Sequence, residues 1–199
     1  MEEFEIIRDI LKGDKEKFRL LVEKYKQLVF RTCMGFVHDK DDADDLTQEV
    51  FIQAYQSLSK FKKESAFSTW LYRISVNASL NKIRKESGIS FLQRIESLFS
   101  GEVKNDPPFS ASDLDNPENI FIRQEHSHWI QKALDSLPEN QRTAIILSKY
   151  DDLPQKEIAE IMNITEGAVE ALLQRAKKNL REKLSGDGQR KSKKQRRKN

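Results

Sequence analysis

Apolar residues recur at three- and four-residue spacing along most of this chain, and that spacing constrains the fold more than any other feature. It places apolar side chains on one face of an α-helix, whereas a half-buried strand needs strict alternation. The longest stripe runs from Phe18 to Phe36, and shorter ones begin at Phe4, Ala43 and Phe67. The chain has only seven glycines, which argues against a β-sandwich. The sequence therefore predicts an all-α protein.

Length and cysteine content exclude several classes of protein. A chain of 199 residues suits one ordinary domain or two small ones. No apolar run reaches the roughly 18–20 residues of a membrane span, and the acidic start Met1-Glu2-Glu3 is neither a secretory signal nor a transit peptide. The single cysteine, Cys33, excludes a disulfide framework and a cysteine-built zinc site. We expect a soluble, cytoplasmic protein that does not span a membrane.

The apolar stripes also set approximate helix boundaries. Asp39, Asp41 and Asp42 stand at the start of one helix, where the positive end of the helix dipole favours acids. Residues 89–100 could form a short amphipathic helix of their own. The predicted helices cover about residues 4–11, 18–37, 41–58, 67–86, 139–150, 155–162 and 166–184.

The composition changes between Gly101 and Asn119, where three prolines appear among Ser, Asp and Asn and the periodicity is lost. This composition is typical of a linker. We therefore predict two small helical domains, residues 1–88 and 120–184, joined by a flexible linker over residues 89–119.

Charged residues are grouped by sign along the chain. Residues 36–54 hold six acids and one lysine, whereas residues 60–86 hold seven basic residues and two acids. Residues 181–199 hold nine Lys and Arg and two acids. Such zoning indicates different partners for different faces, although each block could also be ordinary solvated surface. The basic segment 185–199 is predicted to be disordered.

Residues 155–174 carry the pattern of a helix-turn-helix motif. Ala159 supplies the small residue where two short helices cross, and Asn163 tolerates the positive φ of a turn. The apolar residues expected on the inner faces are Ile158, Met162, Ile164, Val169 and Leu172. A plain helical hairpin would satisfy part of this pattern, and we favour DNA binding.

The outward face of the second helix in this motif would enter the major groove of DNA. Gln174 and Arg175 are the best base readers there, whereas the lysines suit phosphates. The candidate DNA-contacting residues are Gln155, Lys156, Thr165, Glu166, Gly167, Glu170, Ala171, Gln174, Arg175 and Lys178.

Acidic side chains form a ridge on the helix predicted over residues 41–58. Asp41, Asp45 and Glu49 lie four residues apart and therefore on one face, with Asp44 and Gln48 beside them. These five residues are called the acidic ridge below. The ridge suits a basic partner; an ordinary solvated helix and a metal site are the alternatives. Acids four apart on a straight helix rarely converge on one ion without other ligands.

The segment that follows the ridge combines aromatic, polar and basic residues. Capture of an unstacked DNA base uses aromatic faces, polar pocket groups and a cationic track along the backbone. Trp70, Phe67 and Leu71 suit a hydrophobic core equally well. The candidate residues for this surface are Lys60, Phe61, Lys62, Lys63, Ser65, Phe67, Trp70, Arg73, Asn77, Asn81, Arg84 and Lys85.

Three ordered segments resemble the extracytoplasmic-function sigma factors of bacterial RNA polymerase. Residues 44–55 resemble the family's core-polymerase-binding motif. Residues 67–77, followed by 83–85, resemble its promoter-melting and minus-ten-reading segment. Leu137-Pro138-Glu139 with the helix-turn-helix resembles its minus-thirty-five-reading domain.

This resemblance covers about residues 4–88 and 117–184 and implies a factor that binds core RNA polymerase, recognises a two-part promoter and helps to melt it. It implies contacts with the clamp helices of the largest polymerase subunit and with the flap region, with promoter DNA, and with an anti-sigma factor. It implies no catalytic residue, metal or cofactor, so we do not expect an enzyme. The core-binding residues that it implies are Asp41, Asp44, Asp45, Gln48, Glu49, Phe51, Ile52 and Tyr55.

The chain departs from the family pattern at a few positions. Asn81 stands where many members have Asp. Ala168, Glu170 and Ala171 stand where many have Thr or Ser, Lys or Arg, and Ser, respectively. These departures remove phosphate and base contacts, for which the basic tail could compensate by nonspecific attraction to phosphates.

Two other functions fit parts of the sequence. One is a helix-turn-helix regulator that binds an operator as a dimer without polymerase. The other is a metal-dependent nuclease that uses Asp41, Asp42, Asp45 and Glu49, which lack ligands from outside the helix. His126 and His128 point apart in a helix and do not favour a zinc pair.

Overall fold

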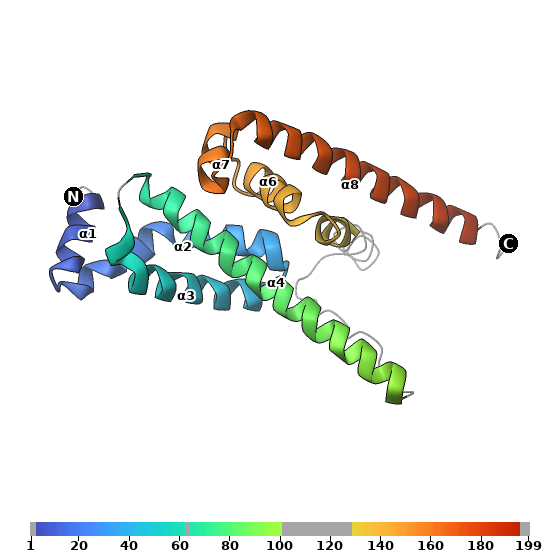
Figure 1. The fold of residues 1–199 in the computed structure, drawn as a ribbon, viewed down its shortest axis with the longest axis horizontal. Coiled ribbons are helices and arrows are strands. Elements are labelled where there is room, and N and C mark those ends of the chain that lie inside the picture. Colours follow the sequence, from blue (N-terminus) through green and yellow to red (C-terminus); the bar gives the residue numbers. More distant parts are fainter. Residues whose placement is uncertain (1–2, 63, 101–128, 196–199) are drawn as a thin grey trace, which may run out of the picture. The chain divides into compact units, whose positions relative to one another are not determined.

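Helices form all of the regular structure in the part of the chain that the structure describes. The structure is a computed structural model, and it describes residues 3–62, 64–100 and 129–195 (Figure 1). The helices are α1 (Glu3–Leu11), α2 (Phe18–Val37), α3 (Lys40–Ser57), α4 (Phe67–Ser100), α6 (Glu139–Lys149), α7 (Gln155–Met162) and α8 (Glu166–Gln195). Two 3-10 turns, η1 (Lys15–Lys17) and η2 (Leu58–Lys60), connect some of them, and residues 129–135 are also helical. The all-α prediction is confirmed.

Two compact units make up the chain. The first comprises residues 1–81 and 138–177, and it therefore contains α1 to α3, the first part of α4, α6, α7 and the start of α8. The second comprises residues 82–137 and 178–199. The proline-rich part of the predicted linker lies outside the described residues.

In the amino-terminal part of the first unit, α2 and α3 pack closely side by side (Figure 1). Their facing stripes supply fully buried side chains, among them Val29, Cys33, Ala43 and Val50. Each large aliphatic side chain removed from water contributes about 1.5–3 kcal/mol. The periodicity that predicted these helices thus also identified the faces that hold them together.

Local backbone signals place the ends of these helices. Gly13, at φ 115°, makes the turn after α1. His38 closes α2 in the left-handed conformation. Asp39 caps α3, because its side chain accepts a 3.0 Å hydrogen bond from the Asp42 amide. The predicted ends of α1, α2 and α3 are confirmed to within about two residues.

The carboxyl-terminal part of the first unit is built from α6, α7 and the start of α8. Pro138 and Pro154 precede α6 and α7, where a missing amide proton has no cost. Fully buried residues of this part include Ile146, Leu147, Ile158 and Val169. The predicted helices 139–150 and 155–162 are therefore confirmed.

The described parts of the second unit are residues 82–100 of α4, residues 129–137 and residues 178–195 of α8. Lys82 pairs with Glu86 at 3.3 Å, one turn apart on α4. Within the described residues, no helix is long and apolar enough to cross a membrane.

Two predicted helix ends were wrong. α4 does not end near residues 86–88 but continues through Gly88 to Ser100. α8 does not give way to a disordered tail at residue 185 but continues to Gln195. A glycine inside a helix costs about 1 kcal/mol relative to alanine, whereas extending an existing helix needs no new nucleus. Residues 196–199 lie outside the described part of the chain.

Candidate functional site

The acidic ridge lies on the exposed face of α3. Asp41, Asp44, Asp45, Gln48 and Glu49 are all exposed, as predicted from their four-residue spacing. The opposite face of α3 packs into the hydrophobic core, so the helix that carries the acidic ridge has a fixed position. Carboxylates that are exposed in this way attract a basic partner and guide its approach.

Two large apolar side chains extend the ridge toward the end of α3. Ile52 is 57% exposed and Tyr55 is 37% exposed. The Tyr55 ring lies edge-on to Phe18 of α2, with centroids 5.0 Å apart, which fixes its orientation. An apolar patch beside charged groups is typical of a protein interface, where burial supplies affinity and charge supplies specificity.

Phe51 was predicted at the polymerase interface, but the structure places it in the core. Its side chain is 7% exposed, and its ring lies edge-on to Phe18. Phe51 follows Val50 on α3, and Phe18 of α2 covers it there. Phe51 therefore helps to hold α3 against α2 and is not available to a partner.

Three aromatic rings cluster where η2 leads into α4. The centroids of Phe61, Phe67 and Trp70 lie 5.3–5.4 Å from one another. Phe61 and Phe67 are buried at 9% and 1% exposure, so these two predicted base-capturing residues belong to the core. Trp70 is half-buried against the same core. The cluster fixes the loop that precedes α4.

The polar candidates around this cluster reach the surface. Ser65 and Arg73 are half-buried, and Lys63 lies outside the described residues. The exposed candidates are Lys60, Lys62, Asn77, Asn81, Arg84 and Lys85. Exposed amides and cations on one loop and helix can follow a nucleic-acid backbone, with Trp70 offering the remaining aromatic surface.

Arg73 has partners that the sequence did not predict. Its Nη2 donates a 2.6 Å hydrogen bond to the Glu160 carbonyl, and its Nε donates to the Ile161 carbonyl at 3.3 Å. Both carbonyls belong to the last turn of α7, where the helix dipole is negative. A residue predicted to contact minus-ten DNA is therefore bound to the helix-turn-helix.

The helix-turn-helix has the predicted turn chemistry. Asn163 follows α7 at φ 54° and ψ 48°, the left-handed conformation that the turn needs. The Thr165 hydroxyl accepts a 3.2 Å hydrogen bond from the Ala168 amide and so satisfies a donor at the start of α8. This turn sets the angle between α7 and α8.

The inner face of the helix-turn-helix differs in part from the prediction. Ile158, Val169 and the small residue Ala159 are buried, as predicted, whereas Met162 and Leu172 are half-buried and Ile164 is 36% exposed. Ile161 and Leu173 are buried instead. The turn at Asn163 interrupts the helical period, which shifts the buried positions on both sides of it.

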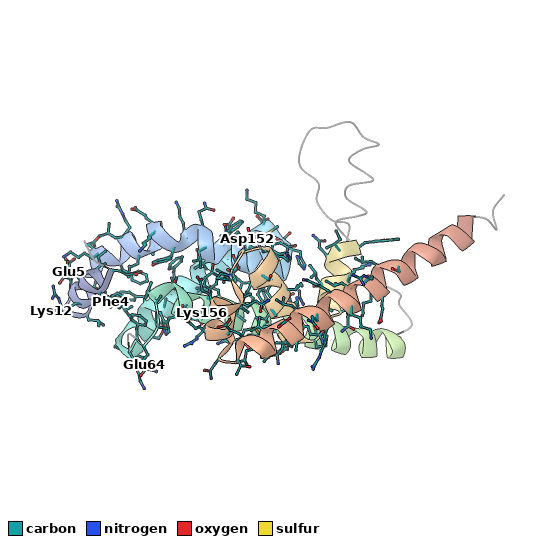
Figure 2. The ribbon with its side chains drawn as sticks, turned by 90° about the horizontal axis from the view of Figure 1, so that it is seen from above. Phe4, Glu5, Lys12, Glu64, Asp152 and Lys156 are labelled. Atoms are coloured by element: carbon teal, nitrogen blue, oxygen red, sulfur yellow. The ribbon has the colours of Figure 1, made fainter. Side chains whose placement is uncertain are left out.

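The outer face of the motif is available to a partner. Ala171 is half-buried, and the Gln174 amide donates to the Glu170 carboxylate at 3.3 Å. The exposed candidates are Gln155, Lys156, Thr165, Glu166, Gly167, Glu170, Gln174, Arg175 and Lys178. Lys156, labelled in Figure 2, stands at the start of α7.

One buried polar cluster was not predicted from the sequence. Asp151, just after α6, is held by Arg31 Nε at 2.9 Å and by Thr32 Oγ1 at 2.9 Å. Burial raises the pKa of the Asp151 carboxyl, and the bonds from Arg31 and Thr32 oppose that rise. The pair is separated by 120 residues in sequence, so helical periodicity carried no signal for it.

The described residues contain no cluster of three or more His, Cys, Asp or Glu that could hold a metal ion. His126 and His128 lie outside them. The acids of the ridge are spread along the surface of α3, so the nuclease alternative has no site in the described part.

Two family models match the chain. The model for Sigma-70 region 2 matches residues 21–89, which include the acidic ridge and the start of α4. The model for Sigma-70 region 4 matches residues 127–180, which include the helix-turn-helix.

Curated relatives match over nearly the full chain. The RNA polymerase sigma-H factor of Pseudomonas aeruginosa is 32% identical over 87% of this chain and 89% of its own length. The ECF RNA polymerase sigma factor SigW of Bacillus subtilis is 33% identical over 89% of this chain and 94% of its own. The ECF RNA polymerase sigma-E factor of Escherichia coli K12 is 33% identical, over 90% and 92%.

Two solved structures share the fold. CnrH in complex with the cytosolic domain of CnrY matches with a TM-score of 0.62 and 21% identity, over 92% of this chain and 96% of that one. The sigma factor RpoE of Bartonella quintana in complex with the anti-sigma factor NepR matches with a TM-score of 0.57 and 20% identity, over 85% and 98%.

Proposed function

The chain belongs to the extracytoplasmic-function family of bacterial RNA polymerase sigma factors, and we propose that it acts through three surfaces whose residues are named above. It is a sigma factor that binds core RNA polymerase and directs it to promoters. Such a factor acts by binding, and we assign it no catalytic residue. Its place of action is the cytoplasm, where the polymerase works.

The first proposed surface is the acidic ridge with Ile52 and Tyr55. Its supporting observation is an exposed acidic face beside two exposed apolar side chains on a helix that the core holds in place. The partner is the basic coiled coil formed by the clamp helices of the largest polymerase subunit. Charge steers the encounter, and burial of Ile52 and Tyr55 adds affinity.

The second proposed surface reads and melts the minus-ten element. Lys60, Lys62, Arg84 and Lys85 would follow the phosphates of the unpaired strand, and Trp70 would meet an unstacked base. Phe61 and Phe67 are assigned to the support of this surface, because they are buried.

The third proposed surface is the outer face of the helix-turn-helix. It would read the minus-thirty-five element in the major groove, with Gln174 and Arg175 at base edges and Lys156 and Lys178 at phosphates. We propose residues 1–88 and 120–184 as the two functional regions. The flap region of the polymerase would hold the second of them.

An anti-sigma factor is a further partner. The structural relative RpoE is seen in complex with the anti-sigma factor NepR. We propose that this chain is regulated in the same manner, by a protein that covers its DNA- or polymerase-binding surfaces.

Charge reversal on the ridge tests the proposal. The double substitution Asp45→Lys and Glu49→Lys is expected to weaken binding to core polymerase at least about tenfold, a cost of roughly 1.4 kcal/mol or more. The matched control is Glu23→Lys on α2, an exposed acid whose partner is Arg19 at 3.0 Å. Fluorescence anisotropy with purified core polymerase measures the affinity. Equal binding by the wild type, the ridge variant and the control would refute the role of the acidic ridge in polymerase binding.

Run-off transcription on genomic promoters tests the whole function. Wild-type protein is expected to make core polymerase initiate at specific sites, and the ridge variant is expected to lose this ability in proportion to its binding. A regulator that acts without polymerase would instead bind promoter DNA alone and leave core polymerase unable to initiate.

A further inference from the structure

The second helix of the helix-turn-helix carries an acid on the face that would meet DNA. Glu170 lies in the second turn of α8, which begins at Glu166 after the turn at Asn163 (Figure 1). Its side chain is exposed. In such a motif, the residues near the start of the second helix reach base edges in the major groove. An acid at this depth needs a hydrogen-bond donor on a base, because the phosphates on both sides of the groove repel it.

Glu170 is not neutralised by a basic side chain in the described part of the chain. Its partner there is the amide of Gln174, whose Nε2 donates a 3.3 Å hydrogen bond to Glu170 Oε1 one turn along the helix. Glu23 on α2, by contrast, pairs one turn away with the guanidinium of Arg19 at 3.0 Å. A neutral amide leaves the charge of Glu170 in place. The carboxylate therefore keeps the capacity to accept a hydrogen bond from a further donor.

Short side chains beside Glu170 allow the helix to approach the groove closely. Gly167 lies nearly one turn earlier and is exposed, and nothing lies within 4 Å of the position that a Cβ would take there. Ala171 follows Glu170, is half-buried and ends in a single methyl group. Because these two neighbours are short, the carboxylate of Glu170 and the amide of Gln174 project beyond them. These two side chains are therefore placed to reach the floor of the groove.

The chemistry of the base edges determines which base the Glu170 carboxylate can accept from. In the major groove only cytosine N4 and adenine N6 donate hydrogen bonds, whereas guanine O6 and thymine O4 accept them. Adenine N6 stands beside the acceptor N7, which would repel the second carboxylate oxygen. Cytosine N4 stands beside a C–H group, which does not. Cytosine is therefore the base that suits a carboxylate.

The hydrogen bond to Glu170 also fixes the orientation of the Gln174 amide. One hydrogen on Nε2 is directed at Glu170, so the amide keeps its other hydrogen and its oxygen for DNA. Adenine presents the matching pair of groups, N7 as acceptor and N6 as donor. Four residues span about 6 Å of helix, so the two bases lie one or two base pairs apart at about 3.4 Å each.

We propose that Glu170 determines promoter specificity, by accepting a hydrogen bond from the exocyclic amine of a cytosine in the minus-thirty-five element and by holding Gln174 toward a nearby adenine. The inference rests on the proposed reading of that element by the helix-turn-helix, and it names the bases that are read. Glu170 is a direct contact for the first base and a positioning residue for the second.

Selection from random sequence tests this in the holoenzyme. Core polymerase carrying the full chain is mixed with promoter duplexes whose minus-thirty-five element is randomised, and the bound duplexes are sequenced. The wild-type protein is expected to enrich cytosine at one position at least about fivefold over each other base. It is expected to enrich adenine within two base pairs of that cytosine.

Three substitutions separate the two roles of Glu170. Glu170→Ala should remove the cytosine preference, weaken the adenine preference, and improve binding to duplexes with guanine or thymine at that position, because the repulsion is gone. Glu170→Gln keeps the size of the side chain without its charge and should shift the preferred base from cytosine to adenine, which an amide matches. Gln174→Ala should remove the adenine preference and leave the cytosine preference.

The matched control is Glu160→Ala, which removes an exposed acid from α7 of the same motif. The first helix of such a motif crosses the DNA backbone and does not enter the groove. This variant should therefore change the affinity for all sequences alike and leave the base preferences unchanged. Circular dichroism checks that each variant keeps its helices.

The role of Glu170 is overturned if the wild-type holoenzyme enriches an element without such a cytosine, if Glu170→Gln leaves the cytosine preference unchanged, or if Glu160→Ala also removes it. An unchanged adenine preference in Glu170→Ala would overturn the positioning of Gln174. Failure of the proposed function has a different result, since the wild-type holoenzyme would then enrich no sequence at all in the randomised element.

Discussion

Asp39 shows how a single side chain determines where the functional helix begins. Its backbone is extended, at φ −123° and ψ 137°, and its carboxylate accepts from the Asp42 amide. One of the four free amides at the start of α3 is thereby satisfied, and the negative charge lies at the positive end of the helix dipole. The orientation of the acidic ridge depends on this start.

Asp39→Ala is expected to destabilise the protein by about 1 kcal/mol, the usual cost of losing a helix cap. Asp39→Asn keeps an oxygen in the same place and should cost only a few tenths of that. Urea unfolding followed by circular dichroism measures both variants. Equal losses for the alanine and asparagine proteins would show that the cap bond contributes nothing.

The residue types alone could not show which of the large apolar candidates pack in the core and which are exposed to a partner. Phe51 and Ile52 are neighbours in the same motif, yet one is 7% and the other 57% exposed. The helical period assigned the face of α3 toward α2 correctly, but Phe51 is covered by Phe18 from another helix. Phe61 is buried against Phe67 and Trp70, and packing between residues of different elements is not encoded in local spacing. Phe67 differs, because its helical spacing suited the core equally well from the start.

At the scale of elements, the turn between α7 and α8 controls how the recognition helix is presented. Asn163 adopts a left-handed conformation there, and its amide bonds the carbonyls of Ala159 and Glu160. Residues other than glycine and asparagine occupy this region only at a cost of roughly 1–2 kcal/mol. Tolerance of a positive φ predicts Asn163 for this position, and the structure confirms it.

Asn163→Ala is therefore expected to lower the free energy of unfolding by about 1 kcal/mol. Asn163→Gly is the control, because glycine adopts the same φ without strain and should leave stability within a few tenths of wild type. Thermal unfolding of the full chain provides the comparison. If glycine proved as harmful as alanine, the side chain rather than the backbone conformation would be the important feature.

The existence of the helices was predictable, but two of their ends were not. Apolar stripes identified α2 and α3 almost to the residue, because both helices bury one face along their whole length. Residues 89–100 of α4 keep an amphipathic pattern, but Gly88 separates it from the earlier stripe, and beyond residue 184 of α8 the sequence is polar and contains Gly186 and Gly188. There the helix continues because extending an existing helix needs no new nucleus. The pattern of apolar and polar residues along the sequence does not show this.

At the scale of the whole molecule, opposite charges are assigned to different tasks. We propose that the acids of α3 face a protein partner, while the bases around α4 and at the carboxyl end suit DNA. Tethering two weak DNA readers in one chain raises their effective concentration once the first has bound.

Deletion of residues 186–199 tests the contribution of the basic end. This segment holds seven Lys and Arg and one acid, and each phosphate contact adds about 0.9 to the slope of log affinity against log salt. The truncated factor, bound to core polymerase, is expected to bind promoter DNA more weakly, with a slope shallower by between about 1 and 6. Filter binding between about 50 and 200 mM salt measures both the affinity and its slope.

The control for this deletion is a chain in which residues 186–199 are scrambled at constant composition. Attraction to phosphates depends on charge and not on order, so the scrambled chain should keep the wild-type slope. A truncated factor with an unchanged slope would show that these cations do not meet DNA. If scrambling made the slope as shallow as deletion does, then DNA would recognise the order of the cations along α8, which extends to Gln195.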